Sequence, residues 1–92
     1  MKSKYQTIYE RLILRAQQRE LQGYCERHHI IPRCMGGSDD KSNLVKLTPE
    51  EHYTAHLLLI KIHPKHKGLH LAIRILCQGS KFTVKNNKKY GW

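Results

Sequence analysis

Residues 26–56 read ERHHIIPRCMGGSDDKSNLVKLTPEEHYTAH. Four of the seven histidines of the chain lie in this stretch: His28, His29, His52 and His56. A capping-box pattern predicts a helix that starts at Pro49: Thr48 lies directly before Pro49, and Glu51 lies three residues after Thr48. In that helix His52 and His56 are four residues apart, so both imidazoles leave the same face. Two histidines at this spacing can bind one metal ion.

Two short strands are predicted before this helix. Residues 25–31 contain Ile30 and Ile31 and stop at Pro32, which favours a strand, and residues 44–47 (LVKL) favour a second one. Residues 32–42 between them contain two glycines followed by turn-forming polar residues, so they are expected to form a loop. The helix after the second strand should run from residue 49 to about 63, because Pro64 ends it.

This order of strand, loop, strand and helix, with histidines on the first strand and on the helix, resembles the HNH nuclease family. That family has the ββα-metal fold, also called the His-Me finger, and the letters of its name would correspond to His29, Asn43 and a histidine of the helix. The pattern is similar to the nuclease domain of the DNase colicins, which also has a Glu two residues before a His-His pair and a helical His-x-x-x-His. The runs NLVKLTPEEH and AHLLL also resemble small HNH endonucleases encoded by phages.

The resemblance implies a metal-dependent DNA endonuclease. His28 and His29 are adjacent, so in a strand they point to opposite faces, and one can enter a metal site while the other faces the scissile phosphate. By resemblance, His28 is a metal ligand together with His52 and His56, and His29 is the general base. Imidazole titrates near neutral pH, which suits this role.

Three further residues are candidates for supporting roles. Glu26 is two residues before His28, on the same nominal face, and can orient a catalytic imidazole or hold a metal-binding one in the right tautomer. By resemblance, Asn43 fixes the loop so that His29 is presented correctly. Arg33 follows the histidine pair and can hold a phosphate, although a generic loop arginine fits the sequence equally well.

The metal is expected to be one divalent ion: Zn, Ni, Mg or Mn. Three imidazoles favour zinc or nickel because of ligand softness. Members of the family with acidic ligands use magnesium.

The charge of the chain indicates a nucleic-acid partner. Seventeen Lys and Arg residues against seven Asp and Glu residues give a formal net charge of +10 in 92 residues, which favours a polyanion such as DNA. The first helix contributes an arginine row at four-residue spacing, for which a solvated helix face is an equal alternative. The candidate DNA contacts are Arg11, Arg15 and Arg19 in that row and Lys81, Lys85, Lys88 and Lys89 in the C-terminal tail.

The predicted fold class is α+β and mostly helical, as a single nuclease domain over residues 1–92. An N-terminal helix is expected within residues 1–23, from Ser3 to about Leu21, with an apolar stripe of Tyr5, Ile8, Tyr9, Leu12, Ile13 and Ala16. The ββα-metal motif covers residues 24–63. A helix over about 65–77 and a basic tail complete residues 64–92.

The sequence contains no apolar run long enough to span a membrane and no signal-peptide core. Its three cysteines form no C-x-x-C pair, which favours free thiols in a reducing cytoplasm. A cytoplasmic location is therefore expected, in the host cell if a phage encodes the protein.

Two other functions fit the same residues. The first is a non-catalytic, zinc-stabilised nucleic-acid-binding module, which would have a closed four-ligand site that includes His29 or a cysteine. The second is a basic nucleic-acid-binding protein without a metal. The sequence leaves the oligomeric state open in each case.

Overall fold

The computed structural model describes residues 2–79, which form three α-helices and one two-stranded antiparallel sheet. The α-helices and strands are, in chain order, α1 (Lys4–Gln17), β1 (Glu26–His29), β2 (Leu44–Leu47), α2 (Pro49–Ile62) and α3 (Lys67–Gly79). The loop between the strands contains two short 3-10 turns, η1 (Arg33–Met35) and η2 (Lys41–Asn43). The mostly helical α+β class with a ββα core is therefore confirmed.

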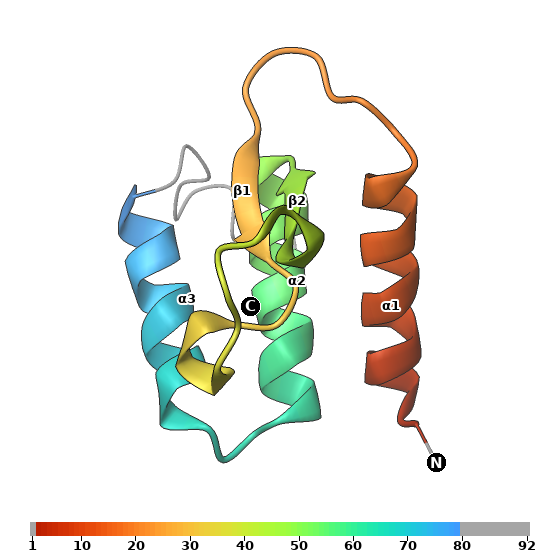
Figure 1. Ribbon diagram of the computed structural model, residues 1–92. Helices are drawn as coiled ribbons and strands as arrows, with labels where there is room; N and C mark the ends of the chain where they lie inside the picture. Colours follow the sequence, from red (N-terminus) through yellow and green to blue (C-terminus); the bar gives the residue numbers. More distant parts are fainter. Residues whose placement is uncertain (1, 80–92) are drawn as a thin grey trace.

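Helix α2 is the central element of the fold. Both α1 and α3 pack against it, and Figure 1 shows α2 between these two helices with the hairpin of β1 and β2 beside it. A core of apolar side chains from α1, α2, α3 and β2 fills the space between the elements. Its buried members are Tyr9, Ile13, Ala16, Val45, Leu47, Ala55, Leu58, Leu59 and Leu69.

The start of α2 has the predicted capping box. The Thr48 hydroxyl accepts from the backbone N–H of Glu51 at 3.2 Å, and the Glu51 carboxylate accepts from the backbone N–H of Thr48 at 2.9 Å. Pro49 occupies the first turn, where its missing N–H leaves no hydrogen bond unmade. His63 is the C-cap, so the predicted helix is correct to within one residue.

Helix α1 ends four residues before the predicted end. Ser3 caps its start, and Tyr9, Ile13 and Ala16 are buried as expected, but Ile8 is 47% exposed and lies outside the core face. After Gln17 the chain leaves the helix, and Arg19 forms a bidentate ion pair with Glu51 in the first turn of α2. This long-range contact replaces the last predicted turn of α1, and sequence periodicity cannot anticipate it.

The hairpin pairs Glu26 with Leu47 and His29 with Leu44. Strand β2 has the predicted bounds, whereas β1 is shorter than the predicted residues 25–31. The strand does not extend to Ile31, because the backbone N–H and carbonyl of Ile31 bind the side chain of Asn43 in place of a strand partner.

Helix α3 starts at Lys67, two residues later than expected, and continues to Gly79, two residues beyond the expected end. Leu69 in its first turn is fully buried. No helix within residues 2–79 has the length and apolar character needed to cross a lipid bilayer. The predicted basic tail with Lys81, Lys85, Lys88 and Lys89 lies outside the described residues.

Candidate metal centre and active site

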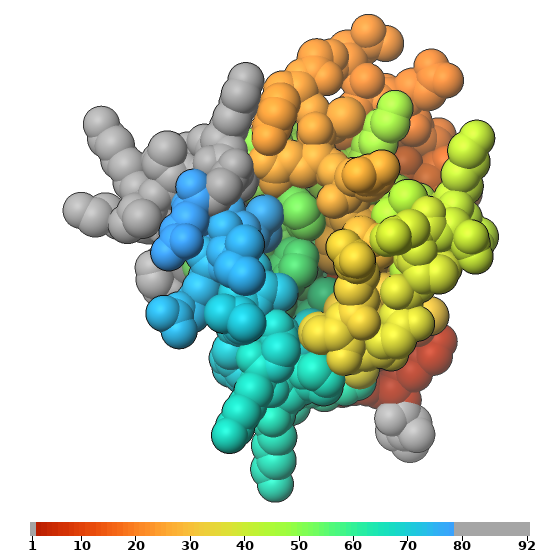
Figure 2. Space-filling view, turned by 60° about the vertical axis from the view of Figure 1, so that its left-hand side comes forward, coloured from red at the N-terminus to blue at the C-terminus, as the bar shows by residue number. Residues whose placement is uncertain are grey.

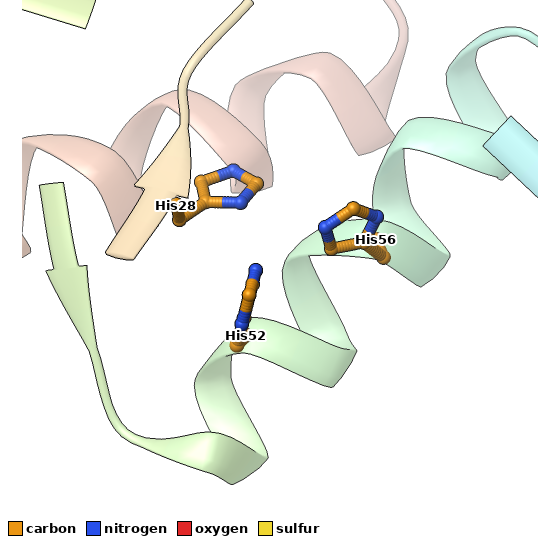
Figure 3. Close-up of side chains that lie close together, drawn as sticks. All are labelled: His28, His52 and His56. Atoms are coloured by element: carbon orange, nitrogen blue, oxygen red, sulfur yellow. The ribbon is translucent and has the colours of Figure 1, made fainter. Parts of the chain in front are cut away.

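His28, His52 and His56 form one compact cluster. Strand β1 contributes His28 and helix α2 contributes the other two, and Figure 3 shows the three rings facing a common space. The ring centroids are 4.9 to 5.2 Å apart, and one nitrogen of each ring lies within 4.8 Å of the others. The side chains are therefore close enough together to hold one metal ion.

The cluster consists of neutral imidazoles. Burial, reinforced by the neighbouring His56 and His52, lowers the pKa of His28 to about 2, and burial followed by the neighbouring His52 and His29 lowers that of His56 to about 4. The pKa of His52 is also lowered by burial, although the Glu26 carboxylate opposes the shift. Only a neutral imidazole has a free nitrogen lone pair, so at neutral pH the cluster is ready to bind a cation without first releasing protons.

The hydrogen bonds around the cluster leave two of its buried ring nitrogens unpaired within residues 2–79. His28 Nδ1 and His56 Nδ1 are buried and have no hydrogen-bond partner within residues 2–79. Unpaired buried nitrogens are costly unless something binds them, and three clustered imidazoles suit a zinc- or nickel-like ion. The residues present therefore fit a metal ion.

Glu26 holds His52 from the side away from the cluster. Its Oε1 lies 2.9 Å from His52 Nδ1, and its Oε2 accepts from the Tyr24 hydroxyl at 2.7 Å. A carboxylate accepts hydrogen bonds, so it favours the tautomer with hydrogen on Nδ1, which leaves His52 Nε2 free. Of the two orienting roles open to Glu26 in the sequence, contact with a histidine of the helix is the one observed.

His29 is not a member of the cluster, as its position in the strand predicts. Its side chain is 24% exposed, whereas His28 is 1% exposed. His29 Nε2 lies 2.7 Å from Asp39 Oδ1 in the loop. The His29 contact, followed by the charge of Arg33, lowers the pKa of Asp39. Asp39 therefore presents a carboxylate that favours hydrogen on Nε2 and a lone pair on Nδ1 of His29.

Asn43 ties the loop between the strands to the end of β1. Its Oδ1 accepts from the backbone N–H of Ile31 at 2.8 Å, and its Nδ2 donates to the carbonyls of Ile31 and Ser38 at 3.0 and 2.8 Å. Gly37 packs directly on the Ile31 carbonyl, and any Cβ at this position would overlap it. The loop that carries Asp39 is thus held against β1 by a buried amide and a close backbone approach.

His29, His52 and His56 also line one cleft, with a cavity volume of about 430 Å³. Figure 2 shows α3 as one wall, β1 and the following loop as the other, and α2 on the floor. Arg27 and Arg33 lie on the loop side, whereas Leu71, Ala72, Ile75 and Leu76 make the α3 side apolar. The cleft therefore has a cationic wall and an apolar wall, with the histidines between them.

The structure distinguishes among the cationic candidates. Arg33 is 73% exposed and only loosely paired with Asp39, with 3.9 Å between Nε and Oδ1. Arg19 is bound to Glu51, and Arg15 Nη2 lies 3.8 Å from the same carboxylate. The predicted row of three arginines on one helix face is wrong at Arg19, because α1 has already ended there. Arg11 is exposed on α1 and has no ion pair within residues 2–79.

A fourth metal ligand is absent from the cluster within residues 2–79, where the potential metal-binding group consists of the three histidines alone. His29 faces the cleft instead, and Cys25, Cys34 and Cys77 lie outside the cluster. This arrangement differs from the closed four-ligand site expected of a zinc-stabilised binding module.

The sequence did not reveal two residues at the site. Tyr9 reaches His28 from α1 with its hydroxyl, but in the sequence it is one residue of an apolar stripe, and nothing links it to a histidine 19 positions later. In the sequence, Asp39 is one of the turn-forming polar residues that follow the two glycines. The only indication of its role in the sequence is that it is an acidic residue in the loop after the histidine pair.

Comparison with known proteins found several phage relatives. Over 69 residues the chain is 68% identical to probable mobile endonuclease B of Enterobacteria phage T4, a match that covers 75% of this chain and 26% of that protein. It is 56% identical over 86 residues to probable mobile endonuclease E of the same phage, covering 92% of this chain and 57% of the relative. Probable mobile endonuclease D of that phage is 49% identical over 70 residues, covering 71% and 27%.

The chain thus spans between about a quarter and just over half of the length of these relatives. No model of a known protein family matches the chain. The comparison with solved structures gave no match either.

Proposed function

We propose that this chain is an HNH endonuclease that hydrolyses DNA phosphodiester bonds with the help of one divalent metal ion. The observation that carries the proposal is a cleft with cationic residues on its wall. The cluster of three neutral imidazoles opens onto this cleft through His52 and His56, and a separate imidazole, His29, lines it as well. The relatives named probable mobile endonucleases support the nuclease activity. We also propose that residues 1–92 act as one nuclease domain, in the cytoplasm of a host cell.

His28, His52 and His56 would hold the ion, which we expect to be Zn, Ni, Mg or Mn. When bound, the ion supplies positive charge that stabilises the negative charge developing on the phosphate and on the leaving oxygen. Glu26 keeps the ring of His52 in the orientation and tautomer that leave Nε2 for the cluster.

His29 is the proposed general base. Asp39 accepts the hydrogen on Nε2, so Nδ1 keeps the lone pair that can take a proton from water. Because His29 lies next to His28 on the opposite face of β1, its ring reaches the cleft without joining the cluster. A water held between His29 and a phosphate in the cleft would lose its proton to Nδ1 as its oxygen attacks phosphorus, and the bond between phosphorus and the leaving oxygen would break.

Asn43 is the proposed positioning residue for this base. Its three hydrogen bonds hold the loop, and with it Asp39, in register with the end of β1. The consequence is that the imidazole of His29 is held by both its strand and its carboxylate partner.

Arg33 and Arg27 are the proposed phosphate contacts next to the reacting bond. Both line the cleft with His29, and Arg33 is exposed enough to reach a ligand. Guanidinium groups bind phosphate oxygens through paired N–H donors. Arg11 remains a candidate for contact with DNA farther from the site, whereas Arg15 and Arg19 serve first as partners of Glu51.

The test is incubation of the purified chain with supercoiled plasmid, with EDTA and with each added divalent ion. We expect nicked or linear product with at least one ion, none with EDTA, and loss of product in His29→Ala. A protein that binds zinc and DNA but leaves the plasmid intact with every ion would overturn the nuclease proposal. That result would favour the zinc-stabilised nucleic-acid-binding module instead.

A further inference from the structure

Tyr9 joins the first helix to the histidine cluster. It lies in the middle of α1, outside residues 26–56, and is only 4% exposed. Its hydroxyl oxygen is 2.8 Å from His28 Nε2 and 2.7 Å from the backbone carbonyl oxygen of Ile30. One buried hydroxyl thus contacts two points of the first strand segment, one of them a member of the cluster.

The direction of these two hydrogen bonds follows from the groups involved. A carbonyl oxygen only accepts, so the single hydroxyl hydrogen of Tyr9 is donated to Ile30. The hydroxyl oxygen must then accept from His28, and His28 Nε2 must carry the hydrogen. In a neutral imidazole the other nitrogen, Nδ1, is then left with the lone pair.

The surroundings of His28 Nδ1 agree with this tautomer. The atom is buried and has no hydrogen-bond partner within residues 2–79, and its ring packs against those of His52 and His56. The opposite tautomer would put a hydrogen on this buried Nδ1, which has no acceptor at hydrogen-bond geometry within residues 2–79, at the cost of a desolvated donor. A lone pair at the same position is what a metal ion requires.

We propose that Tyr9 is a positioning residue of the metal centre, which fixes the ring and the tautomer of His28 so that Nδ1 faces the cluster. This inference rests on the proposed metal site. Tyr9 acts on His28 as Glu26 acts on His52: each holds the ring nitrogen that is turned away from the cluster. The two histidines would therefore present different nitrogens, Nδ1 from His28 and Nε2 from His52.

The same geometry makes α1 part of the metal site, although the helix lies outside the ββα motif. Tyr9 is held in place by the core, since Ile13 and Ala16 on the same face of α1 are buried with it. Docking of α1 and ordering of His28 are thus coupled through one hydroxyl group.

The first test needs no metal and no DNA. Nitrogen-15 NMR of the full chain in EDTA, with imidazoles labelled and the pH above the titration of the cluster, distinguishes the protonated from the bare ring nitrogen. We expect His28 with Nε2 protonated and Nδ1 bare in the wild type. A signal for hydrogen on Nδ1 would overturn the inference, whatever the nuclease assay gives.

The second test removes the hydroxyl by Tyr9→Phe. Its matched control is Tyr5→Phe, one turn earlier on α1, where the side chain is half-buried and the hydroxyl has no hydrogen bond within residues 2–79. Loss of a partner that orients a metal-binding histidine typically weakens metal affinity about 10- to 100-fold. We expect that loss for Co²⁺ in Tyr9→Phe by calorimetric titration, and an affinity close to wild type in Tyr5→Phe.

The outcomes separate this inference from the function on which it rests. Wild-type protein that binds no Co²⁺ would contradict the proposed metal site itself. If the wild type and Tyr9→Phe bind Co²⁺ with equal affinity, only the proposed role of Tyr9 is contradicted, and the metal site stands. The ring nitrogens of His28 in Tyr9→Phe should also move from one fixed tautomer toward an average, a change that a hydroxyl serving only to pack the core would not produce. If Tyr9→Phe does not fold, the tautomer of His28 measured by NMR in the wild type still tests the inference.

Discussion

His28 and His29 are consecutive residues of β1, yet their imidazoles lie in different environments. His28 is buried in the cluster with Nε2 on Tyr9, and His29 faces the cleft with Nε2 on Asp39. The alternation of a strand separates the two rings, because successive side chains point to opposite faces. One dipeptide can in this way supply both a metal ligand and a base.

The first prediction uses this separation. His29→Ala should lower the rate of plasmid cleavage by about 10²- to 10⁴-fold, the usual cost of a lost general base. Metal affinity should stay near wild type, because His29 lies outside the cluster. His28→Ala should instead abolish both metal binding and cleavage. Calorimetric titration of both variants checks the assignment, and metal lost in His29→Ala but kept in His28→Ala would reverse the two roles.

The second prediction concerns Glu26. Glu26→Gln replaces the carboxylate next to His52 Nδ1 with a weaker acceptor that can also turn an N–H₂ group toward the ring. Metal affinity should fall by about 10-fold or more. The control is Glu20→Gln, which removes the same charge from an exposed residue outside the cluster. Equal affinities of the two variants would mean that Glu26 acts only through its charge.

Much of the ββα motif could be predicted from the sequence because its determinants are local. The capping box at Thr48, the proline at the first turn and the four-residue histidine spacing all act within a few residues, and α2 and β2 were predicted almost to the residue. The opposite orientation of His28 and His29 follows in the same way from strand geometry.

The errors and omissions have a common physical origin in contacts between distant segments. Helix α1 stops early where Arg19 binds Glu51, 32 positions later. Tyr9 and Asp39 act through hydrogen bonds to histidines that are 19 and 10 positions away, and no pattern of polarity distinguishes them beforehand from a core residue and a turn residue. The sequence therefore indicated the residues of the cluster and Glu26, which holds His52, but neither Tyr9 nor Asp39.

The third prediction concerns the stability of the metal-free protein at different pH values. The folded-state pKa values of His56 and His28 are about 4 and about 2, below the unfolded value of about 6.5. Between these values and 6.5 the unfolded chain binds protons that the folded protein does not. Stability should therefore be highest above about pH 6.5 and fall as the pH drops toward 4, by up to about 1.4 kcal/mol per pH unit for each histidine.

Thermal unfolding in EDTA at pH 7.5, 6.5 and 5.5 measures this effect. The carboxylates with lowered pKa are Glu10, Asp39 and Glu51. In the unfolded chain they titrate near their ordinary values, 3.8 for Asp and 4.5 for Glu, so they contribute mainly below this range. His56→Leu should reduce the dependence on pH, because it removes one of the buried imidazoles. A melting temperature that stays constant from pH 7.5 to 5.5 would contradict the buried neutral cluster.

The last prediction concerns a pair of like charges on the hairpin. Arg27 and Lys46 are directly opposite each other in the register of β1 and β2, both are exposed, and neither has an ion pair within residues 2–79. Like charges directly opposite each other destabilise a sheet, and an anionic partner would relieve the repulsion between them. Arg27 also lines the cleft with His29, where the backbone of bound DNA would meet it.

Arg27→Gln should therefore change stability and binding in opposite directions. The free protein should gain roughly 0.2 to 1 kcal/mol of stability at low salt, because the repulsion across the strands is removed. DNA affinity in EDTA should fall, and its log–log dependence on salt should become less steep by about 0.9 for one lost phosphate contact. Fluorescence anisotropy over a salt series measures the slope. The matched control is Arg74→Gln on the exposed surface of α3, which lies outside the lining of the cleft and should leave the slope closer to wild type. If Arg27→Gln binds DNA with wild-type affinity and slope, the hairpin does not contact the backbone, and Arg33 would be the better candidate for the cationic side of the cleft.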